Sequence, residues 1–252
     1  MKQHSTLLIT GLLGVVVLSS IGCRRVRNIY TRTDEIRMGT QFVTAFNESK
    51  DGAKIVRSGP MVNRLQRVAL PIIEAARKDW EVPYSVTLIK DNEINAFAVP
   101  GGPMYVNTGL MQLATSDDEL ASVLAHEVSH IVKRHSAQQL SDAAVKQGVA
   151  GILFGRSSAD VRTVIGLTLD LKDREFSRGD EAQSDEYGFK YLVAAGYNVR
   201  GMASMFTKMQ ESAAKSSEKL AFLSTHPLTR KRIEAAEKRA ESYENGTWKA
   251  PR

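Results

Sequence analysis

The chain has one cysteine and no internal repeat, and its basic residues are spread along the 252 residues apart from a local cluster of Arg24, Arg25 and Arg27. A single cysteine excludes a disulfide within the chain. The formal charge of +6 is spread among acidic residues, and there is no zinc-finger spacing, phosphate-binding loop or basic stripe with interleaved aromatics. These absences argue against a nucleic-acid partner. Apolar residues make up 42% of the sequence and charged residues 25%, which is typical of a globular domain with extensions.

The one apolar run that matters for a membrane lies at the N-terminus. Lys2 gives it a positive start, and Leu7 to Leu18 is rich in leucine and valine, as in a secretory signal peptide. Gly22 directly before Cys23 resembles a bacterial lipobox. We therefore predict a lipoprotein signal peptide over residues 1–22, cleavage before Cys23 and a diacylglyceryl group on its sulfur.

A retained membrane helix is the alternative, because the uncharged stretch from Ser5 to Gly22 has 18 residues, close to the lower limit for a bilayer span. Either way, the globular part is expected outside the cytoplasmic membrane, joined to a membrane by a tether and helix over residues 23–58. Arg24, rather than aspartate, follows the cysteine. By resemblance to enterobacterial lipoproteins, this favours a periplasm-facing lipoprotein of the outer membrane in a bacterial cell envelope.

Two histidines in His126-Glu127-Val128-Ser129-His130 form the most informative pattern of the chain. On a helix, residues four apart lie on one face and one turn apart, so both imidazoles can hold one Zn²⁺ ion. Glu127 then lies beside the metal, where its carboxylate can take a proton from the attacking water and pass it to the leaving amine. This H-E-x-x-H pattern is the signature of a zinc metalloprotease.

The residues around this motif predict the helix that it requires. Ser116 and Glu119 fit a capping box, and we predict a helix from about Asp117 to Leu140. Apolar neighbours indicate that the helix is buried, which argues against two ordinary surface histidines. These neighbours are Leu120, Val123, Leu124, Val128 and Ile131.

The rest of the pattern predicts an α+β fold, mostly helical, with a small few-stranded sheet beside the metal-binding helix. Helices are expected at residues 34–46, 61–80, 180–195, 200–216 and 229–243, a strand at 86–90, and two extended pieces joined by a Pro-Gly-Gly-Pro turn within 99–107. The catalytic domain should occupy residues 59–245, with a C-terminal tail at 246–252. Residues 141–179 are the hardest to interpret, either as a helix packed over the site or as a mobile flap.

A catalytic zinc site needs three protein ligands and an open position, so a further ligand must follow the motif. A histidine ligand six residues after His130 is excluded, because that position holds Ser136. His135 comes one residue too early and would point elsewhere on the helix. We interpret His135 as a structural or surface histidine.

A glutamate from a later helix is the other way to complete the site. Glu175, Glu181 and Glu186 are the candidates. Glu181 is favoured because Asp185 lies one helical turn further along the same face. A carboxylate there can accept the free N–H of a metal-binding histidine and fix its tautomer. Two acidic residues on a helix surface would be the alternative.

Four separated motifs resemble the membrane-associated zinc metallopeptidases of the Ste24/HtpX/BepA type, a gluzincin family with a zincin-like domain. They are Asn95-Ala-Phe-Ala-Val-Pro-Gly-Gly, His126–His130, Phe176-Ser-Arg-Gly-Asp-Glu-Ala-Gln-Ser-Asp-Glu-Tyr-Gly and Ser224-Thr-His-Pro-Leu-Thr-Arg-Lys-Arg. Together they span about residues 60–240. The similarity is strongest to the soluble, periplasmic lipoprotein members, because the chain has no core of several membrane spans.

This resemblance implies roles for individual residues. Glu181 matches the third zinc ligand, and Asp185 matches an aspartate that supports the ligands. His226 matches a histidine near the metal, where it either donates a hydrogen bond to the oxyanion of the tetrahedral intermediate or occupies the open zinc position as a self-inhibitory plug. Arg232 matches a basic residue that closes the motif, and we expect it to brace this loop by pairing with a carboxylate.

The substrate side of the family is represented by Asn95, Ala96, Phe97 and Ala98, which resemble its substrate-binding strand. An extended peptide can add to such an edge through backbone hydrogen bonds. The resemblance thus implies that proteins and peptides are the partners of this site.

These observations together predict a membrane-tethered zinc metalloendopeptidase with one Zn²⁺ per chain. Its expected substrates are cell-envelope proteins, and the resemblance favours misfolded ones. The alternative is a latent protease, closed by His226 or by residues 141–179, that acts mainly as a chaperone or assembly factor for envelope proteins. The intact set of metal-binding residues argues against a purely non-enzymatic protein but leaves latency open. The sequence gives no indication of the oligomeric state.

Replacement of Cys23 by alanine is expected to abolish lipidation, because the variant lacks the sulfur that would carry the diacylglyceryl group. The measurement is incorporation of labelled palmitate by bacterial cells that express the full chain, with the unaltered chain as the positive control. A C23A chain that still takes up label would refute the lipobox prediction.

Overall fold

The computed structural model describes residues 28–146, 175–215 and 220–251. The predicted signal peptide, Cys23 and most of the segment 141–179 lie outside these residues. Within the described ranges, no helix is both long and apolar enough to cross a membrane.

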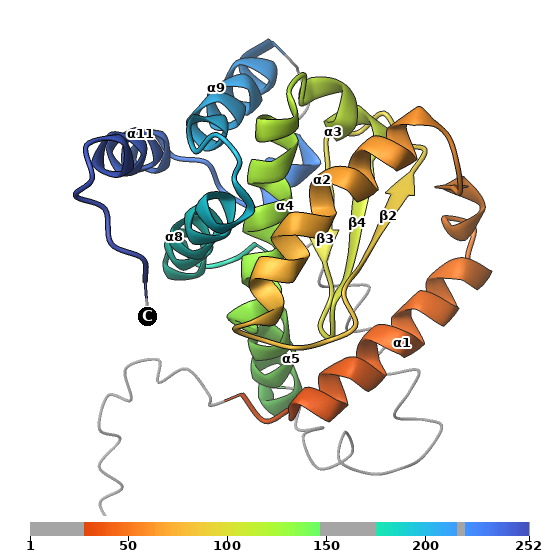
Figure 1. The fold of residues 1–252 in the computed structure, drawn as a ribbon. Helices are drawn as coiled ribbons and strands as arrows, with labels where there is room; N and C mark the ends of the chain where they lie inside the picture. The colour runs from red at the N-terminus through yellow and green to blue at the C-terminus, as the bar shows by residue number, and fades with distance from the viewer. Residues whose placement is uncertain (1–27, 147–174, 216–219, 252) are drawn as a thin grey trace, which may run out of the picture.

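Helices make up most of the described chain. In sequence order they are α1 (Arg32–Glu48), α2 (Pro60–Arg77), α3 (Thr108–Leu113), α4 (Asp117–Val132), α5 (His135–Lys146), α8 (Arg178–Ala195), α9 (Arg200–Lys215), α10 (Ala221–Thr225) and α11 (Arg230–Glu244), with a 3₁₀ turn at Gly52–Lys54. α4 lies at the centre, and α8, α9 and α11 lie on its far side from the sheet (Figure 1).

A mixed four-stranded sheet packs beside α4 and α2. Its strands β1 (Ile55–Val56), β2 (Ser85–Ile89), β3 (Ala96–Ala98) and β4 (Pro103–Asn107) lie in the order β1-β2-β4-β3. β2 and β4 run parallel, whereas β1 pairs antiparallel with β2 and β3 pairs antiparallel with β4. β3 therefore forms one edge of the sheet, next to α4. This mostly helical α+β architecture confirms the predicted fold class.

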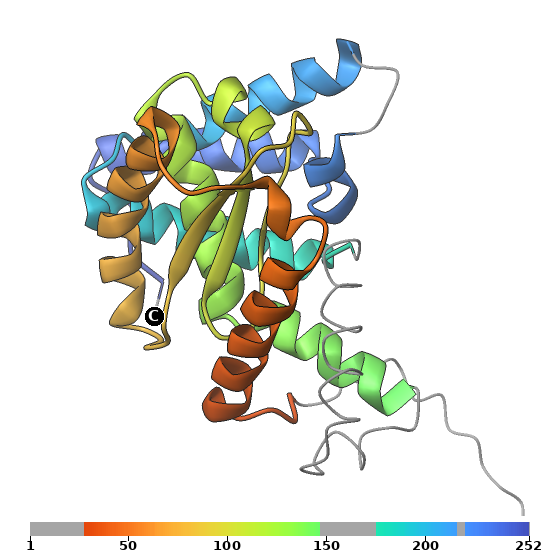
Figure 2. The ribbon, with the colours of Figure 1, turned by 90° about the vertical axis from the view of Figure 1, so that its right-hand side faces the viewer.

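Alternation along β4 explains how both faces of the sheet are covered. Met104 and Val106 belong to the large core shared with α2 and α4. Tyr105 points to the other face, where it packs against Phe42 and Phe46 of α1. Figure 2 shows α1 and α2 on opposite sides of the strands. α4 itself is buried at every position from Glu119 to Ile131, as its apolar pattern predicted.

The predicted helix over residues 117–140 is wrong in one respect, because the chain forms two helices there. α4 ends at Val132, and α5 begins at His135 after a turn in which Arg134 has a left-handed φ of 62°. The Arg134 side chain donates a hydrogen bond to the buried carboxylate of Glu35 in α1. The turn thus depends on a contact between distant parts of the chain, which the local apolar pattern could not reveal.

The other predicted helices, the strand at 86–90 and the glycine turn before β4 are all present, with ends that differ by a few residues. At the turn, Gly101 and Gly102 have φ values of 86° and 119°, which glycine adopts without strain. β1, α3 and α10 were not predicted. Each has six residues or fewer, which is too short for a hydrophobic period to be recognised.

Candidate metal centre

The start of α4 is fixed by the predicted capping box. Ser116 Oγ accepts a hydrogen bond from the Glu119 N–H, and Glu119 Oε2 accepts one from the Ser116 N–H, both at 3.2 Å. Lys208 and Ser204 of α9 also donate to the Glu119 carboxylate, at 2.7 and 2.6 Å. Burial opposes the charge of this carboxylate, but the donors outweigh it and lower its pKa to about 2. The cap is therefore ionised and bonded near neutral pH.

α8 approaches α4 closely enough to bring its acidic residues to the histidines. Glu181, Ser184, Asp185 and Gly188 recur at helical spacing along α8, and all four are buried. A Cβ atom on Gly188 would lie 3.2 Å from the backbone nitrogen of His126, closer than ordinary van der Waals contact. The two helices therefore lie almost backbone to backbone beside the metal-binding motif.

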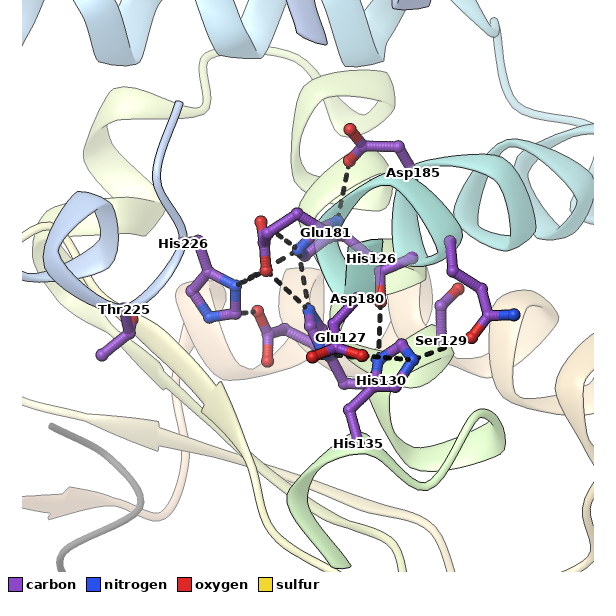
Figure 3. Close-up of polar contacts among 12 residues, drawn as sticks. His126, Glu127, Ser129, His130, His135, Asp180, Glu181, Asp185, Thr225 and His226 are labelled. Carbon is purple, nitrogen blue, oxygen red and sulfur yellow. Dashed lines mark hydrogen bonds and ion pairs between the residues drawn. The ribbon is translucent and has the colours of Figure 1, made fainter. Parts of the chain in front are cut away.

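Four buried side chains converge where α4, α8 and the loop after α10 meet (Figure 3). His126, His130, Glu181 and His226 each offer one metal-binding atom, and these atoms all lie within 4.8 Å of one another. The Nε2 atoms of the two α4 histidines are 3.0 Å apart. They lie 3.5 Å (His126) and 3.3 Å (His130) from the carboxylate oxygens of Glu181. His226 Nδ1 lies 3.0 Å from Glu181 Oε1.

This set of donor atoms fits a zinc ion. Zinc prefers imidazole nitrogen and carboxylate oxygen in a tetrahedral arrangement at about 2.0–2.2 Å, which places donor atoms about 3.3 Å from one another. The separations of 3.0, 3.3 and 3.5 Å among His126, His130 and Glu181 agree with that value. These three side chains can therefore close around one ion, with His226 as a fourth neighbour.

An ion-pair network supports the ligands from behind. Asp185 Oδ1 lies 3.0 Å from His126 Nδ1, where it can accept the ring N–H and leave Nε2 free for a metal. Arg232 donates two hydrogen bonds of 2.8 Å to the Asp185 carboxylate. It also donates to the Pro227 carbonyl oxygen and pairs with Glu181 Oε2. The arginine thus ties the loop after α10 to α8.

Burial and charge act in opposite directions on these groups. Burial raises the pKa of Asp185, but Arg232 and the hydrogen bond with His126 outweigh it and hold the pKa below its usual range. Burial also disfavours a charged His126, but Glu181 and Asp185 outweigh it and raise its pKa to about 9. A metal ion must therefore displace a proton from this imidazole.

Glu127 lies beside His226, close to the metal-binding side chains (Figure 3). Its Oε1 atom is 3.4 Å from His226 Nε2, and the residue is only 1% exposed. Burial raises the pKa of Glu127 above its usual value, although His226 and His126 act against this. A carboxylate with a raised pKa is better suited to accept a proton and return it near neutral pH. His226 therefore contacts the metal-binding carboxylate of Glu181 through Nδ1 and the predicted base through Nε2 (Figure 3).

A pocket opens beside Glu127 and His226, along the edge strand β3. Phe97 and Ala98 line it, as the substrate-side prediction requires, and the remaining lining residues are Val99, Ser136, Phe176 and Thr225.

The other two residues of the substrate-side prediction do not line this pocket. Ala96 is fully buried, and the carbonyl oxygen of Asn95 accepts a hydrogen bond from the Asn107 N–H. Only the second half of the predicted segment therefore faces the site.

His135 does not point away from the site. Of its two interpretations, structural or surface, the structure excludes the surface one. It is 3% exposed, and its Nδ1 lies 3.0 Å from Nδ1 of His130. The turn between α4 and α5 brings it back onto this ligand. Phe176 opens the third motif, but no role was predicted for it. Its ring lies over the His130 imidazole with centroids 4.0 Å apart, in a segment whose sequence gave no periodic signal.

Comparison with known protein families agrees with this geometry. A family model described as peptidase family M48 matches residues 61–240. The chain belongs to peptidase family M48. This membership confirms the resemblance that the four motifs indicated, and the match lies inside the predicted domain over residues 59–245.

Individual relatives come from bacteria and from eukaryotes. The beta-barrel assembly-enhancing protease of Escherichia coli (strain K12) is 27% identical over 216 residues, which cover 82% of this chain and 44% of that protein. The mitochondrial metalloendopeptidase OMA1 of Schizosaccharomyces pombe is 31% identical over 184 residues, which cover 70% of this chain and 51% of that protein. The chain thus spans about half the length of these curated relatives.

Replacement of Arg232 by methionine is expected to lower the free energy of unfolding by about 3–5 kcal/mol, because the buried carboxylates of Asp185 and Glu181 would both lose their arginine partner. Urea denaturation of the metal-free protein measures this loss. Arg230→Met is the matched control on the same helix, since the Arg230 side chain is 88% exposed and pairs with Glu234 at the surface. A loss in R232M no larger than that in R230M would show that the network contributes no stability.

Proposed function

We propose that this chain is a zinc metalloendopeptidase. The observation that carries the proposal is the convergence of His126, His130 and Glu181 at zinc-ligand spacing, with the buried carboxylate of Glu127 beside a pocket on an edge strand. Membership of peptidase family M48 supports the same activity.

The protein side of the mechanism follows from the positions of these groups. His126, His130 and Glu181 would hold one zinc ion per chain, while Asp185 keeps the His126 proton on Nδ1. When bound, zinc supplies a Lewis acid that favours ionisation of water and polarises the scissile carbonyl. Glu127 takes the proton from the attacking water and delivers it to the departing amine.

His226 decides whether the resting site is open. Its Nδ1 lies 3.0 Å from Glu181 Oε1 and 3.3 Å from His126 Nε2, which is the position of a fourth ligand. This placement supports the plug role, in which the imidazole must leave before water and substrate can enter. The oxyanion role requires the same ring to stay near Glu127 and donate to the substrate oxygen.

The proposed substrates are unfolded proteins or peptides outside the cytoplasmic membrane. The pocket lies along β3, where the backbone N–H of Ala98 donates a hydrogen bond to the Glu127 carboxylate. A peptide added to this edge would therefore pass the base. Backbone pairing tolerates many sequences, which suits misfolded proteins. A bacterial relative named for beta-barrel assembly supports a cell-envelope location.

The anchor belongs to the same proposal. A lipid on Cys23 would tether the enzyme to the outer membrane, facing the periplasm. The alternative of a latent protease that acts mainly as a chaperone has less support, because the metal-binding cluster and the raised pKa of Glu127 favour catalysis, although a plug formed by His226 fits latency.

Replacement of Glu127 by glutamine is expected to reduce cleavage of unfolded casein by at least about 100-fold, because general base catalysis contributes factors of that size. The assay uses the full zinc-loaded chain in detergent, with E127Q and unaltered protein compared at equal zinc content. Glu186→Gln changes an exposed glutamate on α8 and is the matched control. Equal cleavage by E127Q and E186Q would exclude Glu127 as the base, and no zinc-dependent cleavage by any protein would contradict the proposed activity.

Replacement of His226 by alanine separates its two roles. If His226 is a plug, H226A opens the metal position and cleavage of casein increases several-fold. A decrease of about 100-fold or more is expected instead if the imidazole donates to the oxyanion. The measurement is initial rate at saturating casein and equal zinc content. We expect the increase, because Nδ1 faces the metal-binding atoms.

A further inference from the structure

Each histidine of the metal-binding motif has a different partner behind it. His126 Nδ1 lies 3.0 Å from a carboxylate oxygen of Asp185. His130 Nδ1 lies 3.0 Å from a nitrogen, Nδ1 of His135. His130 is fully buried and His135 is 3% exposed. Two ring nitrogens at this distance form a hydrogen bond only if one carries a proton and the other does not.

The metal decides which nitrogen carries the proton. A zinc ligand needs an unprotonated Nε2, so the proton of a neutral His130 must sit on Nδ1. His135 Nδ1 is then the acceptor, and the proton of His135 sits on Nε2. That nitrogen lies 2.9 Å from Gln183 Oε1, an amide oxygen that can accept it, and 3.5 Å from the buried Asp180 carboxylate, which also favours a proton on Nε2. Ser184 Oγ approaches His135 Nδ1 only to 3.3 Å, so the contact with His130 is the shorter one.

A neutral acceptor suits this side of the site. Carboxylates of Glu127, Glu181 and Asp185 already surround the two ligand histidines. A further carboxylate behind His130 would add negative charge to a buried region, which is costly. An imidazole accepts the Nδ1 proton without adding a charge.

The turn before α5 explains how His135 reaches His130. On a continuous helix a residue five positions further on lies roughly 140° around the axis, on a different face. Here Arg134 takes a left-handed conformation, and its guanidinium bonds to Glu35 of α1 and to the Tyr30 carbonyl oxygen. These anchors fold the chain back, so the His135 ring meets the ligand that precedes it.

We infer that His135 is a positioning residue for the metal centre, which holds His130 in its Nδ1–H tautomer and orients Nε2 towards the metal. It acts through His130 and does not touch substrate or metal. The inference rests on the metal site of the proposed function.

Two substitutions of His135 each remove one hydrogen bond. Asn places an oxygen where Nδ1 stood, so H135N keeps the acceptor for His130 and loses the donor to Gln183. Gln places its amide where Nε2 stood, so H135Q keeps a donor for Gln183 and loses the acceptor. If His135 is merely structural, both variants should lose zinc affinity equally. If it positions His130, only H135Q should lose zinc affinity.

The zinc affinity of the full chain distinguishes these cases. It is measured in detergent by competition with a chromophoric chelator. H135Q is expected to bind zinc about 10–100-fold more weakly than the unaltered protein, the usual effect of losing a partner of a ligand histidine. H135N should bind zinc with nearly unaltered affinity. The midpoint temperature of thermal unfolding of the metal-free protein should fall by a similar amount in both variants. Equal losses in both variants, or a loss in neither, would overturn the inference. An unaltered protein that binds no zinc would instead contradict the proposed function itself.

A second measurement needs no substitution, in case either variant fails to fold. Nitrogen NMR of the zinc-loaded protein, labelled at histidine, reports the tautomer of each ring. The expected result is His135 neutral with its proton on Nε2. A charged His135, or one protonated on Nδ1, could not accept from His130 and would refute the role.

Discussion

The close contact of α8 with α4 is the constraint on which the centre depends. Gly188 has no side chain where α8 meets the α4 backbone at His126, so the two helices can approach this closely. With the helices at this distance, Glu181 meets the histidines and Asp185 meets the back of His126. Arg232 then stabilises the acidic residues that this packing has buried. The buried charges are therefore a consequence of the packing, and the arginine is what makes them tolerable.

The parts of the site that could be predicted are those set by a local period. His126 and His130 were predicted to share a face because four residues complete a helical turn, and the capping box at Ser116 gave the start of that helix. Asp185 followed from Glu181 by the same period. The choice of Glu181 over Glu175 and Glu186 was only favoured by spacing and needed the family resemblance as well.

The parts that could not be predicted are set by contacts between distant residues. Nothing near His135 shows that Arg134 bonds to Glu35 and breaks the helix, so the ring was assigned to the wrong face. Phe176 reaches His130 from a segment without periodicity. The short elements β1, α3 and α10 gave no pattern either, although α10 leads directly to His226. Tertiary contacts, rather than propensity, determine these features.

The order of the ligands along the chain has a consequence for the assembly of the metal centre during folding. His126 and His226 are separated by 100 positions, and Glu181 lies between them. A growing chain that has made only the H-E-x-x-H helix holds two imidazoles and can grip zinc weakly at best. Tight metal binding then has to wait until α8 has docked, and closure by His226 comes later still. The ion would thus be bound tightly only once the fold is complete, so an incompletely folded chain would have no active site.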